Sequence, residues 1–315
     1  MQKKNNPFML IWRVIYPLLM LLAAEFILEF VIMFGYMFYL MGNGYSVSAT
    51  DTAELENLLT NFIYQYNLYI LIARGIILIP LYYILMRSDV KKAPVRVQYG
   101  PYNRMWLIVV PIVGCAAAMG FNHFVPVFIE VLQSIFKTVA EFMLNKEVAV
   151  DLFKTYNEVS ERIYSGGIFI QILSTVIIAP VVEELLFRGL IYKRLRANLK
   201  TVPAMLLSAF IFGLVHANIV QFVYAFLIGI IVAFVYERFR TIVAPILFHL
   251  GANLLSVLIT NFAPEAGIGL DIGTYMLITV VELAVTFILL KLIDMKVKRE
   301  ACPVVNSEET HDGRQ

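Results

Sequence analysis

The sequence predicts an all-α, polytopic integral membrane protein with about eight transmembrane helices. Of its 315 residues, 60% are hydrophobic and only 15% are charged, whereas soluble domains are usually about a quarter charged. Hydrophobic windows recur along nearly the whole chain, and a spanning helix needs roughly 20 mainly apolar residues. The windows lie near 9–39, 62–86, 105–122, 166–187, 203–217, 219–237, 242–262 and 272–293.

The basic residues fall on every second connection between these windows. Lys and Arg gather in 87–104, in 188–200 and in the tail at 296–299, whereas 41–60 and 263–271 contain acidic residues without a cation. In multi-pass proteins the cytoplasmic loops carry the excess of Lys and Arg. We therefore expect a cell-membrane protein with both termini in the cytoplasm.

The lengths of the windows and the cysteines add three expectations. The first window is long and the fifth is short, so either helix is expected to be tilted, kinked or partly interfacial. The apolar stretch after Arg13 exceeds a signal-peptide core, which predicts a first spanning helix and not a cleaved signal. Cys115 lies in a window and Cys302 in the tail, so neither a disulfide nor a metal-binding Cys spacing is expected.

The longest stretch outside the windows, 123–165, contains a predicted amphipathic helix. Polar residues recur there at three- and four-residue spacing between apolar ones. We expect this helix to lie along the outer membrane surface; an extracellular helix packed on the bundle is the alternative. The polar tail 294–315 is expected to be disordered. The polar positions of the amphipathic helix are Glu130, Gln133, Ser134, Lys137, Thr138 and Glu141.

The first polar motif is Glu183-Glu184-x-x-Phe187-Arg188, at the expected cytoplasmic end of the fourth window. An ionisable group inside a span costs about 2.5–3.5 kcal/mol, so it needs a partner or a function. Glu184 and Arg188 have the favourable order for a helical ion pair. Glu183 is rotated by about 100° from Glu184, which leaves it free to face a cavity as a carboxylate suited to acid–base chemistry. A charge cluster that ends the helix is the alternative.

Two further motifs are Phe212-x-x-x-His216, near the expected outer end of the fifth window, and His249-x-x-x-Asn253 in the seventh. The spacing of four places His249 and Asn253 on one helix face. A lone His in a span is often only a packed, hydrogen-bonded group, but polar groups on three helices favour one buried polar site. Glu183 and His216 can meet only if the fifth helix is tilted or displaced, or if the glutamates lie deeper than the windows indicate.

The three motifs fall in order on consecutive hydrophobic segments. Together they resemble the CPBP intramembrane proteases, which include the type II CAAX prenyl endopeptidases and the bacterial Abi proteins linked to bacteriocin processing and self-immunity. The resemblance runs from Ile168 to Phe262. It implies three regions, which are the amino-terminal helices and amphipathic segment in 1–160, a catalytic helical bundle in 161–293 and the tail in 294–315.

The resemblance implies hydrolysis of a peptide bond within the membrane. Carried over to this sequence, it makes Glu183 the base that activates water with help from His216. His249 and Asn253 would then stabilise the oxyanion of the tetrahedral intermediate. The supporting residues would be Glu184, Arg188 and Phe212.

No cofactor is favoured by the sequence. Glu183, His216 and His249 would form a chemically sensible zinc set with one position open for water. However, the sequence contains no HExxH motif, and the family has been interpreted both as metalloproteases and as metal-independent glutamate proteases. Asn253 beside His249 suits an oxyanion hole better than a ligand shell, which favours the metal-independent interpretation and leaves zinc as the alternative.

Other buried charges are expected to be structural. Glu25 and Glu29 share a face of the first window, and Arg74 lies near the middle of the second, so an ion pair between these two helices is expected. Glu282 lies mid-span in the eighth window, and the sequence offers no partner for it.

The leading functional hypothesis is a membrane-embedded endopeptidase that acts on a membrane-anchored protein or a hydrophobic peptide in the bilayer, near the cytoplasmic side. The net charge of +2 does not indicate a nucleic-acid partner. The alternatives are a proton- or ion-coupled transporter and a non-catalytic immunity or scaffold protein. Transporters usually contain a structural repeat, and none is visible here. A prenylated substrate would follow from the family name and not from these residues.

Overall fold

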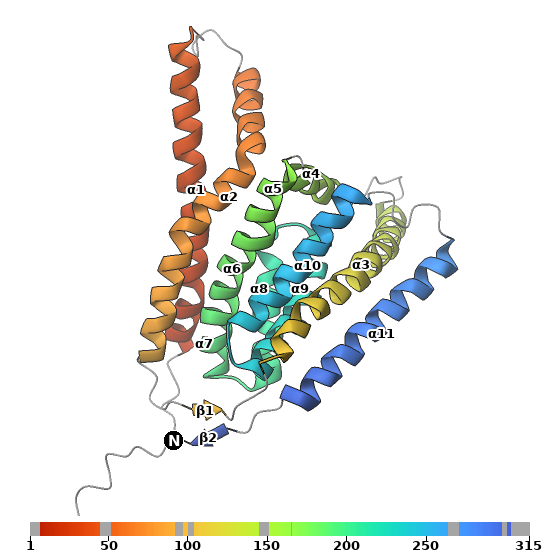
Figure 1. Ribbon diagram of the computed structural model, residues 1–315. Helices are drawn as coiled ribbons and strands as arrows, with labels where there is room; N and C mark the ends of the chain where they lie inside the picture. The colour runs from red at the N-terminus through yellow and green to blue at the C-terminus, as the bar shows by residue number, and fades with distance from the viewer. Residues whose placement is uncertain are drawn as a thin grey trace, which may run out of the picture.

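The computed structural model describes residues 7–44, 52–91, 97–99, 104–144, 151–164, 166–263, 271–297 and 301–303. Seven of the helices in these ranges are long and apolar enough to cross a membrane, and an eighth apolar helix is shorter. The predicted all-α, multi-pass architecture is therefore confirmed. The helices pack side by side, with the described beginning of the chain and its last described strand at the same end of the bundle (Figure 1).

The elements follow the chain in a simple order. The fourth long helix is built of five consecutive parts, two of which, η1 and η2, have π-helical geometry. The helices are α1 (Pro7–Gly42), α2 (Thr52–Lys91), α3 (Trp106–Leu144), α4 (Lys154–Tyr164), α5 (Ile168–Gln171), η1 (Ile172–Ile178), α6 (Ala179–Glu184), η2 (Leu185–Tyr192), α7 (Lys193–Arg196), α8 (Thr201–Leu214), α9 (Ile219–Phe239), α10 (Val243–Phe262) and α11 (Ile272–Val297).

The hairpin of α1 and α2 projects beyond the remaining helices at the end opposite the described termini (Figure 1). The two helices have 36 and 40 residues, so at about 1.5 Å per residue both exceed the roughly 30 Å of a hydrocarbon core. The rings of Tyr36 and Phe62 stack between them with centroids 3.7 Å apart. The expected ion pair is also present, because Arg74 Nη1 lies 2.9 Å from Glu25 Oε1.

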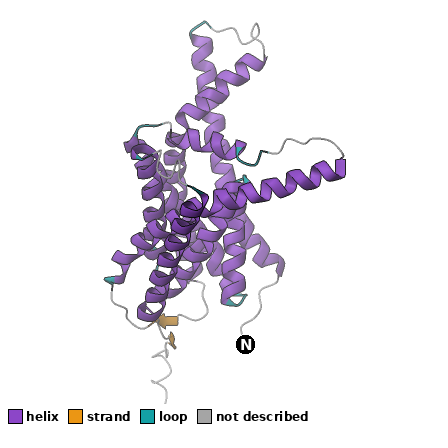
Figure 2. Ribbon diagram, turned by 90° about the vertical axis from the view of Figure 1, so that its right-hand side faces the viewer, coloured by secondary structure: helices purple, strands orange, loops and turns teal. Residues whose placement is uncertain are grey.

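The third window and the amphipathic segment form one continuous helix, α3, and not two helices. No residue between Phe121 and Leu144 ends the helix, although Pro111 and Pro126 each remove a backbone donor. The carboxyl-terminal part of α3 runs sideways away from the bundle (Figure 2). This direction suits the predicted position along the membrane surface. A separate short helix, α4, follows within the same predicted stretch.

The fourth helix extends to Arg196, nine residues beyond the predicted end of its window at 187. The basic residues that indicated a cytoplasmic loop are accommodated because other helices supply buried partners. The guanidinium of Arg194 donates to Asp89 Oδ2 at 2.6 Å and to the Tyr16 hydroxyl at 2.7 Å. Glu183 and Glu184 therefore lie in the middle of the helix, and their expected position at its cytoplasmic end is wrong.

Helices α3 and α10 approach each other at two glycines. A Cβ atom added to Gly251 would collide with the backbone carbonyl of Pro111, and one added to Gly114 would collide with the carbonyl of Phe248. Small residues permit this close approach of two membrane helices. The contact fixes α10, which carries His249 and Asn253.

The tail differs in part from the expectation of disorder. Strand β2 (Ala301–Pro303) pairs antiparallel with β1 (Val97–Tyr99); residues 304–315 lie outside the described ranges. The described beginning and end of the chain lie on the same side of the bundle (Figure 1). This arrangement agrees with an even number of crossings. The side of the membrane on which they lie, and the region boundary at residue 160, stay predictions.

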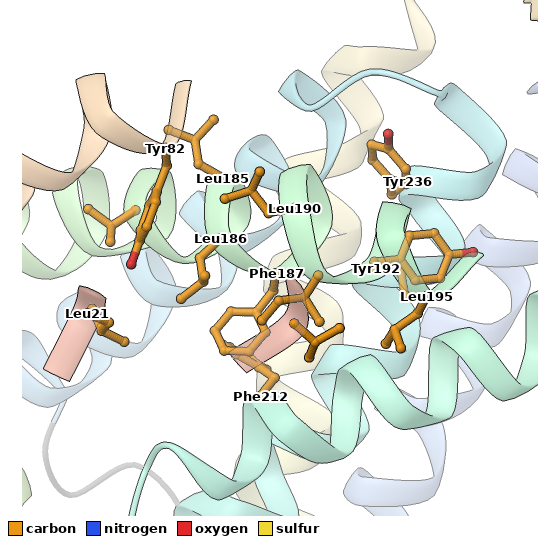
Figure 3. Packing of buried hydrophobic residues seen from close by; sticks show 14 of the residues in the cluster. Leu21, Tyr82, Leu185, Leu186, Phe187, Leu190, Tyr192, Leu195, Phe212 and Tyr236 are labelled. Carbon is orange, nitrogen blue, oxygen red and sulfur yellow. The ribbon is translucent and has the colours of Figure 1, made fainter. Parts of the chain in front are cut away.

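A large apolar cluster fills the space between the fourth helix, α8 and the α1–α2 hairpin. Phe187 and Phe212 meet in its centre with ring centroids 4.8 Å apart at 69° (Figure 3). Both side chains are almost fully buried. These two rings form a rigid apolar base beneath the polar residues of the motifs.

Candidate functional site

A cavity of about 510 Å³ lies within the helix bundle, and the predicted catalytic residues converge on it. Glu183 from α6, His216 from the turn after α8, and His249 and Asn253 from α10 all line its wall. Phe212 also lines it, which places the apolar base directly beside the polar residues. The three motifs, although separated in sequence, therefore contribute to one chamber.

Glu183 and His216 were expected near opposite ends of their windows, at different depths in the membrane. The lengths of two helices explain how they nevertheless meet. Glu183 lies 13 residues before the end of the fourth helix at Arg196, and His216 lies 15 residues after the start of α8 at Thr201. At about 1.5 Å per residue these distances are roughly 20 Å and 22 Å. Because α8 starts a short turn after the fourth helix ends, both residues reach a similar depth.

Glu184 and Arg188 form the predicted ion pair, with 2.9 Å between Glu184 Oε1 and Arg188 Nη1. Both side chains are almost completely buried, at 0% and 1% exposure. Arg188 Nη2 donates to the Gly229 carbonyl at 3.0 Å, and the guanidinium lies over the Phe212 ring, 4.9 Å from its centroid. A buried charge pair is tolerated only with such additional partners. The pair therefore connects the fourth helix with α8 and α9.

His249 lies between the two glutamates. Its Nδ1 is 2.9 Å from Glu184 Oε1 and its Nε2 is 3.7 Å from Glu183 Oε2. A carboxylate oxygen only accepts hydrogen bonds, so Nδ1 is the donor in this contact. This contact fixes the orientation of the ring and directs Nε2 toward Glu183 and the cavity.

Glu183 and Glu184 have opposite environments, as their rotation on the helix predicts. The side chain of Glu183 is 25% exposed and lines the cavity, whereas that of Glu184 is fully buried against Arg188. A carboxylate that faces a cavity can reach a water molecule or a bound ligand. Glu183 is therefore the carboxylate of this pair that is free to take part in chemistry.

His216 lies in the tight turn between α8 and α9. Its Nδ1 is 2.8 Å from the Phe212 carbonyl oxygen, which can only accept, so Nδ1 carries the proton and Nε2 is left available. The next residue, Ala217, has a φ of 57°, a left-handed conformation that is unfavourable for a residue with a side chain. Asn218 then begins α9 by accepting a hydrogen bond from the Gln221 amide at 2.8 Å. The turn thus holds the imidazole at the cavity wall.

Asn253 is held by a backbone contact with the fourth helix. Its Nδ2 donates to the Thr175 carbonyl at 2.9 Å, and Thr175 lies in the π-helical segment η1. The amide nitrogen carries two protons, so one N–H remains after this bond. Asn253 and Glu183 both line the cavity, as His249 does.

The proposed zinc set does not fit the geometry. Within the part of the chain that the structure describes, no group of three or more His, Cys, Asp or Glu side chains could hold a metal ion. Both histidines direct Nδ1 to another group and leave Nε2 available, an orientation that a zinc-binding histidine would also adopt. What argues against a metal centre in this conformation is that Glu183, His216 and His249 do not come together as a group of ligands.

Several residues of the cavity wall were assigned no role at the site from sequence. Glu25, Glu29 and Arg74 of the α1–α2 hairpin line the same cavity, although the sequence predicted only a structural pair for them. Tyr164 and Tyr224 line it as well. No local pattern identifies these residues, because only the packing of distant helices brings them to the chamber.

The partner of Glu282 was also not predicted. His123 Nδ1 lies 2.7 Å from Glu282 Oε2 and joins α3 to α11. Neither residue lines the cavity. This pair is therefore a second, partly buried polar contact, separate from the cavity.

Comparison with known proteins gives two matches in the same region. Residues 165–255 match the family described as "Type II CAAX prenyl endopeptidase Rce1-like". The chain is also 34% identical over 89 residues to "Putative membrane peptidase YdiL" of Bacillus subtilis (strain 168). This match covers 28% of the chain and 36% of the relative's length, so the chain spans about a third of that protein. No solved structure matches the chain significantly.

Proposed function

We propose, from the premise that residues 165–255 belong to the CPBP family of membrane proteases, that the chain is an intramembrane endopeptidase. The observation that carries the proposal is the convergence of Glu183, His216, His249 and Asn253 on one cavity within apolar helices. A carboxylate, two imidazoles and an amide are sufficient for general-base hydrolysis of a peptide bond.

In the proposed reaction, Glu183 removes a proton from a water molecule. The water oxygen forms a bond to the carbonyl carbon of the substrate, and the carbonyl π electrons move to its oxygen. When the intermediate collapses, the carbon–nitrogen bond breaks and Glu183 passes the proton to the leaving amine. The products are a carboxylic acid and an amine, which ionise to a carboxylate and an ammonium group, and no oxidant or co-reactant is needed. The lone pair of His216 Nε2 would orient the water.

The oxyanion would be stabilised by Asn253 and His249. Asn253 has one N–H left after its bond to Thr175. His249 can donate from Nε2 only as the doubly protonated ring, since Nδ1 already donates to Glu184. Because Glu184 already neutralises Arg188, the Glu183 carboxylate, 3.7 Å from Nε2, would balance the charge of that ring. The geometry therefore supports an oxyanion role for His249 in its charged form.

The proposed substrate is a membrane-anchored protein or a hydrophobic peptide. The chamber lies between helices that are long and apolar enough to cross a bilayer. Because Glu183 is in the middle of its helix, we propose cleavage within the depth of the bundle and not at its cytoplasmic end.

The test compares membranes of cells that produce either the wild-type protein or the Glu183→Gln variant. The variant keeps the shape of the side chain and removes the base, so fragments made by the wild-type protein should disappear from the membrane proteome. Glu158→Gln, on the exposed face of α4, is the matched control and should leave the fragments unchanged. Identical fragments in the wild-type and Glu183→Gln membranes would overturn the proposal.

A further inference from the structure

A proline lies within the fourth helix, three residues before Glu183. Pro180 is the second residue of α6, follows the π-helical segment η1 closely, and is buried. A proline inside a helix removes a backbone donor and destabilises the helix. Departures of this kind from local preference are expected where a site needs them. The hydrogen bonds around Pro180 show what this one changes.

The carbonyl of Thr175 loses both of the amide donors that its own helix could offer. In α geometry it would accept from the amide of residue 179, and in π geometry from that of residue 180. The Ala179 amide donates to the Ser174 carbonyl instead, and Pro180 has no N–H. The π register and the proline together therefore leave this carbonyl available to another donor.

Asn253 supplies that donor from α10. Its Nδ2 lies 2.9 Å from the Thr175 carbonyl oxygen, and both residues line the cavity. A backbone carbonyl inside an apolar bundle needs a hydrogen-bond partner. The contact therefore satisfies the carbonyl that Pro180 leaves open, and it fixes the Asn253 amide at the same time.

The same arrangement occurs at a second proline. Pro17 lies inside α1 and removes the amide that would bind the Arg13 carbonyl, four residues earlier. That carbonyl accepts from Arg194 Nη1 of the fourth helix instead. In both places a helix proline releases a carbonyl and a side chain of another helix binds it. Released carbonyls thus serve as acceptors between helices in this chain.

We propose that Pro180 is a positioning residue for Asn253. By keeping the Thr175 carbonyl out of the backbone ladder, it provides the acceptor that orients the Asn253 amide. The second N–H of that amide is then directed to the oxyanion. Pro180 touches no reacting atom and acts only through Thr175 and Asn253. The inference rests on the proposed peptidase function and adds a residue to its machinery.

Pro180→Ala restores the missing N–H. The segment can then return to α register, in which residues 179 and 180 donate to Thr175 and Val176. The Thr175 carbonyl gains a backbone partner, and the Asn253 amide must compete for it. The variant therefore tests whether the absent donor matters.

Two controls isolate the effect of that donor. The α-hydroxy analogue of alanine, incorporated at position 180, has the side chain of Ala but an ester oxygen in place of the N–H. Pro203→Ala removes a proline from the first turn of α8, where an N–H has no acceptor within the helix. Both controls change a proline without giving the Thr175 carbonyl a backbone donor.

The first measurement follows unfolding in mixed micelles and does not need activity. Asn253→Ala should lower the midpoint of unfolding in the wild-type background, because its bond to Thr175 is lost. It should lower the midpoint by less in the Pro180→Ala background, where the carbonyl has a backbone partner. Coupled residues deviate from additivity in this way. Equal losses in both backgrounds would overturn the proposal.

The second measurement uses purified protein in detergent and membranes of cells that produce Glu183→Gln, in which the proposed substrates stay uncut. Pro180→Ala should release fragments about 10–100-fold more slowly than the wild-type protein, because loss of a whole oxyanion donor costs about 10²–10³-fold. The α-hydroxy analogue and Pro203→Ala should both cut at close to the wild-type rate. In the Asn253→Ala background, Pro180→Ala should cause no further loss.

The outcomes separate the two proposals. If the α-hydroxy analogue is as slow as Pro180→Ala, the loss comes from the proline ring, so the positioning role is wrong and the peptidase function stands. If the wild-type protein releases no fragments, the peptidase function fails. The unfolding measurement then still decides whether Pro180 positions the Asn253 amide. Gel filtration of every variant shows that the comparison is made on folded protein.

Discussion

Glu184 and His249 share a hydrogen bond of 2.9 Å between Oε1 and Nδ1, although 65 residues separate them in the chain. The same Glu184 oxygen also receives Nη1 of Arg188 at 2.9 Å. One buried oxygen of Glu184 thus binds both the guanidinium of Arg188 on its own helix and the imidazole of His249 on α10. Glu184 is therefore a positioning residue, whereas Glu183 faces the cavity.

The first prediction concerns the stability that this carboxylate provides. Replacing Glu184 with Leu leaves Arg188 buried without its anion, and removal of one partner from a buried pair typically costs about 3–5 kcal/mol. The double variant Glu184→Leu/Arg188→Leu removes both charges and should be more stable than the single variant. Unfolding curves in mixed micelles measure the difference. A double variant that is no more stable than Glu184→Leu would contradict the pairing.

The second prediction distinguishes His216, which lines the cavity, from His123, which pairs with Glu282 outside it. His216→Ala should lower cleavage about 10²–10⁴-fold, the usual contribution of an acid–base group, with little change in unfolding. His123→Ala leaves Glu282 without the partner seen at 2.7 Å, so it should lower stability by about 1 kcal/mol and keep the activity. Rates and unfolding curves measured on both proteins test this. The reversed pattern would show that His123 belongs to the site.

The third prediction concerns metal. Since Glu183, His216 and His249 are not arranged as a metal centre, treatment of the purified enzyme with a zinc chelator should leave its cleavage rate unchanged. A chelator that does not bind zinc serves as the control. Loss of activity that zinc alone restores, together with stoichiometric zinc in the protein, would show that the site rearranges around a metal.

The spans and the pairs within one motif could be predicted from sequence because they depend on local spacing. The hydrophobic windows locate the helices, and the four-residue separation of Glu184 and Arg188 predicts their ion pair. The prediction that Glu183 faces a cavity follows from its rotation on the helix relative to Glu184. These features require no knowledge of how distant helices pack.

The extent of the fourth helix could not be predicted in this way. Arg188 and Arg194 look like loop residues by charge, but Glu184 of the same helix and Asp89 of α2 neutralise them inside the bundle. The contact of His123 with Glu282 likewise depends on the packing of α3 against α11. The position of α4 at the cavity wall also depends on tertiary packing, because an amphipathic face does not reveal what it covers.

The last prediction tests the helix contact that positions α10. Gly251→Ala would drive a Cβ atom into the Pro111 carbonyl, and because backbone must move to relieve it, the variant should lose about 1–3 kcal/mol of stability. Cleavage should fall as well, since α10 carries His249 and Asn253. Gly35→Ala is the matched control, because no atom lies within 4 Å of its added Cβ and Ala favours a helix over Gly. Unfolding curves and cleavage rates of both variants measure the effect. If Gly251→Ala were as stable and active as Gly35→Ala, the close approach of α3 and α10 would not position the site.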